Sequence, residues 1–175
     1  MKRTRHRRVL VTLWAAVTLA LFASPVGALD VHLLADHQDW EVELHVTRQG
    51  LVCAATTVNR AGEAFVIRIS PDSAVELLIL FDNSHGYREF TVDVVVTGGS
   101  IWQGALFQVA THGGRIGSGY LRDAMPFLED LQKGTQVALA FPNGSETFGD
   151  FSLRGSRAAI DDLVMCYLHI ADRRS

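Results

Sequence analysis

The sequence predicts a mainly β domain, an antiparallel β-sandwich or barrel-like fold with two short helices of the C-terminal half packed on it. Three observations lead to this prediction. Short apolar segments, several of them strictly alternating, recur along the chain. Turn residues separate them at roughly even spacing, and helical spacing of apolar residues appears only late. We expect the helices to cover an open edge or end of the sheet, where unpaired strand edges need protection.

Residues 1–28 have the form of a secretory signal peptide. A basic end precedes the uncharged apolar run Val9–Phe22, and small residues follow up to Ala28. The run is shorter than the roughly 20 residues that span a bilayer. We therefore expect cleavage near Ala28 and one exported domain at 29–175, periplasmic or secreted, with no membrane span; a retained N-terminal anchor is the alternative. Two adjacent arginines suggest twin-arginine export, but their neighbours favour general secretion.

The charge of the exported part excludes one class of partner. The whole chain has 16 basic and 19 acidic residues, and five of the basic ones lie in the predicted leader. Its removal leaves 11 against 19, a net charge of −8. Nucleic-acid affinity comes largely from Lys and Arg that neutralise phosphates, so no nucleic-acid partner is expected.

The first half of the domain predicts a loop followed by strands. Leu29–Asp39 shows no period and is expected to be a loop. Trp40–Val46 alternates between apolar and polar residues, which indicates a half-buried strand. Five further strands are expected between turn signals, at Leu51–Val58, Ala64–Ile69, Val75–Phe81, Phe90–Val96 and Ile101–Ala110.

The second half predicts a first helix from Ala124 or Pro126 to Gln132. Apolar residues recur there at helical spacing, and proline suits only the first turn of a helix. Gly134 lies just beyond the predicted end, where glycine is common. Two strands are expected after it, at Thr135–Phe141 and Thr147–Leu153.

The closing helix carries one of the two cysteines. Ser156 is its expected N-cap, and Cys166 shares a helix face with Leu163 and Ile170, so its thiol is expected to point into the core. An oxidising compartment favours a bridge to Cys53, which would close a loop of 113 residues. Such a loop is worth roughly 4–5 kcal/mol on the chain-entropy model. Two separate buried thiols are the alternative.

Two patterns in the C-terminal third carry a family resemblance. PFLEDLQKGTQVALAF (Pro126 to Phe141) and FSLRGSRAAIDDL (Phe151 to Leu163) resemble the tail of the invasion-associated locus B family of exported bacterial proteins, and of uncharacterised secreted bacterial proteins that share it. The resemblance implies a secreted β-rich domain with no known catalytic residues. Where that family tends to place a central cysteine pair, this chain has glycines in Thr111–Gly119. Neither the family's disulfide scheme nor a role in host-cell invasion is therefore transferred.

The Gly-rich stretch that begins at His112 is the strongest candidate binding site. Glycines let the backbone approach an anion before a helix N-terminus, and Arg115 adds a bidentate contact. The glycine spacing is that of a phosphate loop, but no Lys-Ser/Thr follows, and the chain has no G-x-S-x-G elbow. A strand-to-helix connector and a ligand loop both stay open. The candidate ligand-binding residues are His112, Gly113, Gly114, Arg115 and Ser118.

No catalytic residue, metal site or cofactor is predicted. Ser152 lies in a stretch that resembles a hydrolase box interrupted by a phenylalanine, which moves the serine to the other face of a strand. His32, His37 and His45 lie near aspartates, but their spacing in a predicted loop does not converge on a metal.

The leading functional hypothesis is a non-enzymatic exported domain that contacts a protein partner at the cell envelope. The alternative is a small-ligand or anion-binding module around Arg115. A hydrolase that uses Ser152 or Ser118 is the third hypothesis, and neither serine has an identifiable base.

Overall fold

The computed structural model describes residues 30–70, 74–81, 88–110, 113–116, 124–142 and 147–173. The predicted leader lies outside these ranges. Ten strands form one sheet in the order β1-β2-β3-β4-β5-β8-β7-β6-β9-β10, and all neighbours are antiparallel. The strands are β1 Asp30–His37, β2 Trp40–Thr47, β3 Gly50–Val58, β4 Ala64–Ile69, β5 Val75–Leu80, β6 Arg88–Thr97, β7 Ile101–Ala110, β8 Gly113–Ile116, β9 Gln136–Ala140 and β10 Thr147–Ser152.

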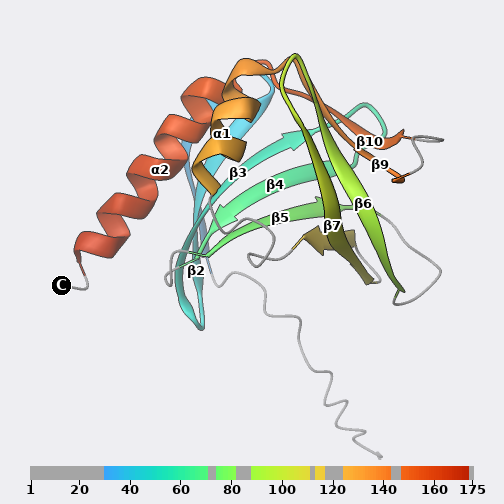
Figure 1. Ribbon diagram of the computed structural model, residues 1–175. Coiled ribbons are helices and arrows are strands. Elements are labelled where there is room, and N and C mark those ends of the chain that lie inside the picture. Colours follow the sequence, from blue (N-terminus) through green and yellow to red (C-terminus); the bar gives the residue numbers. More distant parts are fainter. Residues whose placement is uncertain are drawn as a thin grey trace, which may run out of the picture.

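The mainly β fold with two late helices is confirmed, and its architecture is one open sheet. The helices α1 (Ala124–Lys133) and α2 (Ser156–Asp172) pack together on the curved sheet (Figure 1). The described residues form neither the second facing sheet of a sandwich nor a closed barrel. A single alternating strand pattern fits all three arrangements, because each buries one face of every strand.

The sheet bends until its last strand meets its second. The indole Nε1 of Trp40 donates a hydrogen bond of 3.0 Å to the carbonyl oxygen of Ser152. The backbone N–H of Asp39 donates to the carbonyl oxygen of Arg154 at 3.4 Å. The rings of Phe65 on β4 and Phe151 on β10 lie 5.5 Å apart. Curvature thus brings elements at opposite ends of the chain into contact.

The prediction of a loop at Leu29–Asp39 is wrong. Residues 30–37 form β1, whose register with β2 runs from Asp30 opposite Val46 to His37 opposite Trp40. Two features of this strand explain why the sequence pattern does not indicate it. It is an edge strand with most of its side chains exposed, so its composition need not alternate, and a bulge between Leu33 and Ala35 interrupts the period of two.

The first helix and the glycine after it are confirmed. The N–H of Gly134 donates to the carbonyl oxygen of Asp130 at 2.8 Å and closes the end of α1. The assignment of Ser156 as an N-cap is wrong. Gly155, at φ 90°, holds the cap position, and Ser156 is the first helical residue.

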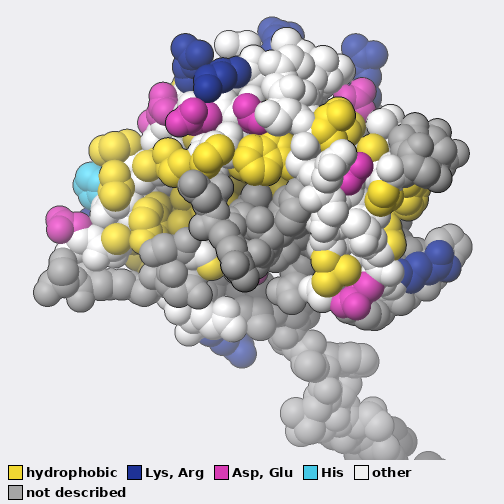
Figure 2. Space-filling view, in the orientation of Figure 1, with side chains coloured by type: hydrophobic (Ala, Val, Ile, Leu, Met, Phe, Trp, Pro, Cys, Tyr) yellow, Lys and Arg dark blue, Asp and Glu magenta, His cyan; other side chains and the backbone are white. Residues whose placement is uncertain are grey.

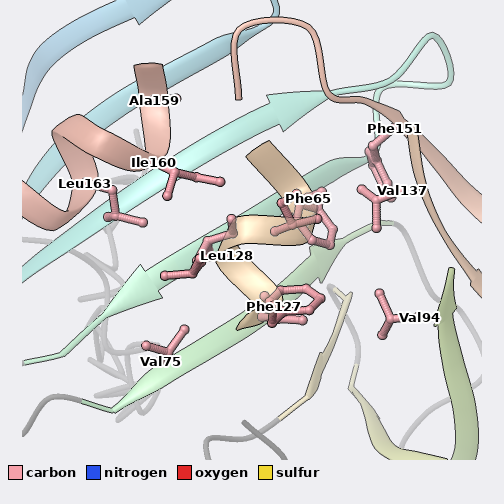
Figure 3. Packing of buried hydrophobic residues seen from close by; sticks show 14 of the residues in the cluster. Phe65, Val75, Val94, Phe127, Leu128, Val137, Phe151, Ala159, Ile160 and Leu163 are labelled. Carbon is pink, nitrogen blue, oxygen red and sulfur yellow. The ribbon is translucent and has the colours of Figure 1, made fainter. Parts of the chain in front are cut away.

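The core lies between the two helices and the sheet (Figure 3). Phe127 and Leu128 of α1 point toward the sheet, and Ile160 and Leu163 of α2 point in beside them. All four side chains are at most 3% exposed. Because α2 brings this apolar face to β3, it also brings Cys166 to the sheet.

Candidate functional site

The predicted disulfide between Cys53 and Cys166 is present. It joins β3 to α2, with an S–S distance of 2.04 Å and 6.1 Å between the Cα atoms. Both cysteines are buried. The bridge holds the second half of α2 against the first strands of the sheet, and so determines what lies between them.

Gly113 and Gly114 of the predicted ligand loop lie in a strand and not in a loop. Residues 113–116 form β8, a strand inside the sheet that pairs with both β5 and β7. The expectation of a loop is wrong for these four residues. A Cβ at Gly114 would lie 2.2 Å from Cζ of Phe107, and one at Gly113 would lie 2.2 Å from the carbonyl oxygen of Ile79. These glycines therefore allow close packing between neighbouring strands, a role that glycine spacing does not distinguish from ligand binding.

As ligand-binding residues, all five members of that candidate site stay predictions. His112 and Ser118 lie outside the described residues, and of Arg115 only the backbone is described. That backbone is opposite Leu78 on one side and Gln108 on the other.

Ser152 of β10 forms hydrogen bonds where the last strand of the sheet approaches β2. Its hydroxyl donates to Oδ2 of Asp39 at 2.6 Å and accepts from the N–H of Arg154 at 3.2 Å. Both partners belong to the junction at which β10 meets β2. The geometry gives the hydroxyl a structural role, with an acidic partner in place of an imidazole.

The three histidines of the first strands each pair with one carboxylate. Nε2 of His32 lies 3.2 Å from Asp30, that of His37 lies 2.7 Å from Asp162, and that of His45 lies 2.8 Å from Glu43. The described parts of the chain contain no group of three or more potential metal ligands. The contact of His37 with Asp162 joins β1 to α2 and had no signal in the sequence.

A polar cleft of about 960 Å³ opens where β10 meets β2. It contains four carboxylates and two guanidinium groups, from Asp36, Asp39, Glu41, Asp150, Arg60 and Arg154. Asp36 and Glu41 are direct cross-strand neighbours. A bulge in β10 between Phe148 and Phe151 holds Asp150 at the rim. The cleft can accept polar groups, but its charges are exposed side chains that water already solvates.

A smaller apolar groove of about 380 Å³ lies between the second half of α2 and strands β1 to β3. We call it the α2 groove. Leu34, Leu44 and Leu51 line it from the sheet, and Met165 and Ile170 line it from the helix. Cys166 also lines it, so the disulfide lies in its wall.

Large apolar side chains around the α2 groove are exposed. Leu34 and Met165, which line the groove, are 49% and 54% exposed. Leu168, on another face of α2, is 52% exposed. Figure 2 shows hydrophobic side chains gathered on the side of the molecule where α2 lies. Exposed apolar side chains that gather on one side of a folded domain typically mark a contact site.

Comparison of the chain with protein-family models, curated proteins and solved structures finds no match. The resemblance to the invasion-associated locus B family stays a prediction. In the described part of the chain, neither helix has the length and apolar character needed to cross a membrane.

Proposed function

We propose that this protein is an exported binding domain, periplasmic or secreted, that acts by contact with another protein and not by catalysis. The observation that carries the proposal is the α2 groove with its exposed apolar rim. The bridge between Cys53 and Cys166 supports the proposal, because oxidising compartments favour such bonds. The leader-like start of the chain supports export.

The groove and the charge of the domain suggest what the partner offers. Leu34 of β1 and Met165 of α2 line the groove from opposite sides, and both are about half exposed. A partner segment with aliphatic side chains that enters the groove buries both. Because the exported part carries a net charge of −8, a partner with a basic surface associates faster than a neutral one. We therefore propose a protein segment with an aliphatic face and basic flanks.

The fixed geometry of the groove also favours binding. The disulfide and the contact of His37 with Asp162 both join α2 to the sheet, one in the helix's second half and one near its middle. Because α2 is attached to the sheet at two points, the groove loses little conformational freedom when a partner binds, and this lowers the free-energy cost of association.

Site-specific photo-crosslinking in the native host tests this function. A photoreactive residue at Met165, which lines the groove, is expected to give an adduct whose mass differs from that of two crosslinked copies of the chain. The same residue at Leu106 of β7, which is 49% exposed, serves as the matched control and should give none. The partner, identified by mass spectrometry and purified, should bind the wild type at least ten times more tightly than Met165→Glu. Adducts of equal yield from both positions, or unchanged binding by Met165→Glu, would contradict the proposal.

A further inference from the structure

The two outer strands of the sheet are protected to different degrees. β10 carries a bulge between Phe148 and Phe151, and its last residue bonds to the indole of Trp40. β1 has eight residues and pairs only with β2 among the described strands. An unpaired strand edge displays N–H and C=O groups that another strand can bind.

The side chains of β1 also leave its edge less protected than that of β10. Val31 is 46% exposed, Leu33 61% and Leu34 49%. Edge strands usually carry charged residues or proline that discourage pairing. Here the middle of an edge strand is aliphatic, which favours an added strand.

We infer that the free edge of β1 pairs antiparallel with β1 of a second copy of this chain, across a two-fold axis at His32. The bulge between Leu33 and Ala35 leaves Asp30–Leu33 as the regular part of the strand. Val31 and Leu33 are two residues apart, so they share a face of the sheet. An axis at His32 places Val31 of each copy opposite Leu33 of the other. The Val31–Leu33 pair therefore occurs twice, and each exposed aliphatic side chain gains an aliphatic neighbour.

The bulge disfavours the next register. An axis at Leu33 would run half of the pairing through the bulge between Leu33 and Ala35, where the ladder is interrupted. The axis at His32 keeps Val31, His32 and Leu33 of both copies within the regular part of the strand. A two-fold axis of this kind gives the isologous contact found in most homodimers.

The pairing has a consequence for the α2 groove. The axis runs perpendicular to the sheet, so α2 of both copies lies on the same face of the joined sheet. Two grooves would then be open to one partner, and a partner with two matching segments would gain avidity. This consequence rests on the proposed function, whereas the pairing does not.

Sedimentation of the exported protein, purified from cells that express the full chain, tests the inference. The wild type is expected to sediment as a dimer, and Leu33→Lys as a folded monomer with an unchanged circular dichroism spectrum. Ile101→Lys is the matched control, because Ile101 is an aliphatic strand residue that is 59% exposed on β7. It should remain dimeric. A monomeric wild type, or a dimer that Leu33→Lys does not weaken, overturns the inference.

Cysteine crosslinking tests the register. His32→Cys is expected to form a covalent dimer on mild oxidation, and Asp36→Cys is not, with peptide mapping to verify that Cys53 and Cys166 stay bridged. Crosslinking from position 36 alone, or equally from both, overturns the axis at His32. A monomer that still gives the partner adduct from Met165 overturns the pairing alone. A dimer that gives no such adduct overturns the proposed function alone.

Discussion

The hydroxyl of Ser156 donates a hydrogen bond of 2.7 Å to the carbonyl oxygen of Leu131, and it is 1% exposed. This bond joins the first residue of α2 to the last turn of α1. A carbonyl oxygen near a helix C-terminus has no partner within its own helix, and here the other helix supplies one. Ser156 therefore connects two helices instead of capping one.

Substitutions at Ser156 separate these two roles. Ser156→Ala leaves the buried carbonyl unpaired and should lower the free energy of unfolding by about 1–2 kcal/mol. Ser156→Asp is the decisive variant. Aspartate caps helices as well as serine does, but a buried carboxylate cannot donate to Leu131, so this variant should lose more stability than the alanine variant. Urea denaturation measures both, and a neutral Ser156→Asp would contradict the connecting role.

Removal of the disulfide should destabilise the whole domain. The bridge closes a loop of 113 residues, and the double variant Cys53→Ala with Cys166→Ala is expected to lose about 4–5 kcal/mol on the chain-entropy model. Urea denaturation with and without reductant checks this. Reductant should affect the wild type and leave the double variant unchanged. A wild type that reductant does not destabilise would contradict the prediction.

Gly114 should not accept a side chain. Gly114→Ala places a methyl group against the ring of Phe107 and is expected to cost about 2–3 kcal/mol through overpacking. Gly104→Ala is the control, because nothing lies within 4 Å of its Cβ position and only its φ of +76° opposes the change. Its cost should be nearer 1 kcal/mol. If thermal denaturation gave the two variants equal stability, the close approach of β7 and β8 would be in doubt.

Asp130 should make stability depend on acid pH. A hydrogen bond from the Ser100 side chain is the largest influence and lowers the pKa of Asp130, whereas burial raises it. Further hydrogen bonds from Trp102 and the Ser100 backbone also lower it, so the pKa lies below its ordinary value of 3.8. A folded-state pKa below the unfolded one stabilises the fold above the unfolded pKa, and this contribution disappears as the pH falls through the folded pKa.

The corresponding test compares Asp130→Asn with the wild type at two pH values. The indole of Trp102 donates to Oδ2 of Asp130 at 3.0 Å, and the N–H of Ser100 donates at 3.2 Å. Asp130→Asn should cost about 1 kcal/mol at neutral pH, since bonds to a charged acceptor become bonds to a neutral one. Near pH 2 the difference should shrink. Asp150→Asn, a change at an exposed carboxylate, controls for net charge, and an equal cost at both pH values would rule out the linkage.

Local patterns alone predicted most strands, both helices and the pairing of Cys53 with Cys166. Alternation of buried and exposed residues is a property of each strand by itself. Helical spacing around Leu163 likewise oriented Cys166, and with two cysteines in the chain only one intramolecular bridge was available.

Tertiary structure decided what depends on neighbours far away in the chain. The inward face of a strand repeats every two residues whether the sheet is flat, closed or doubled. Only contacts between distant strands, such as that of Phe65 with Phe151, show how far the sheet bends. Local signals also cannot tell that Gly114 faces a ring, that β1 is an edge strand with most side chains exposed, or that Ser156 bonds to Leu131. Each of these roles is set by an atom from another element, and the identity of that atom is fixed only when the whole sheet has curved.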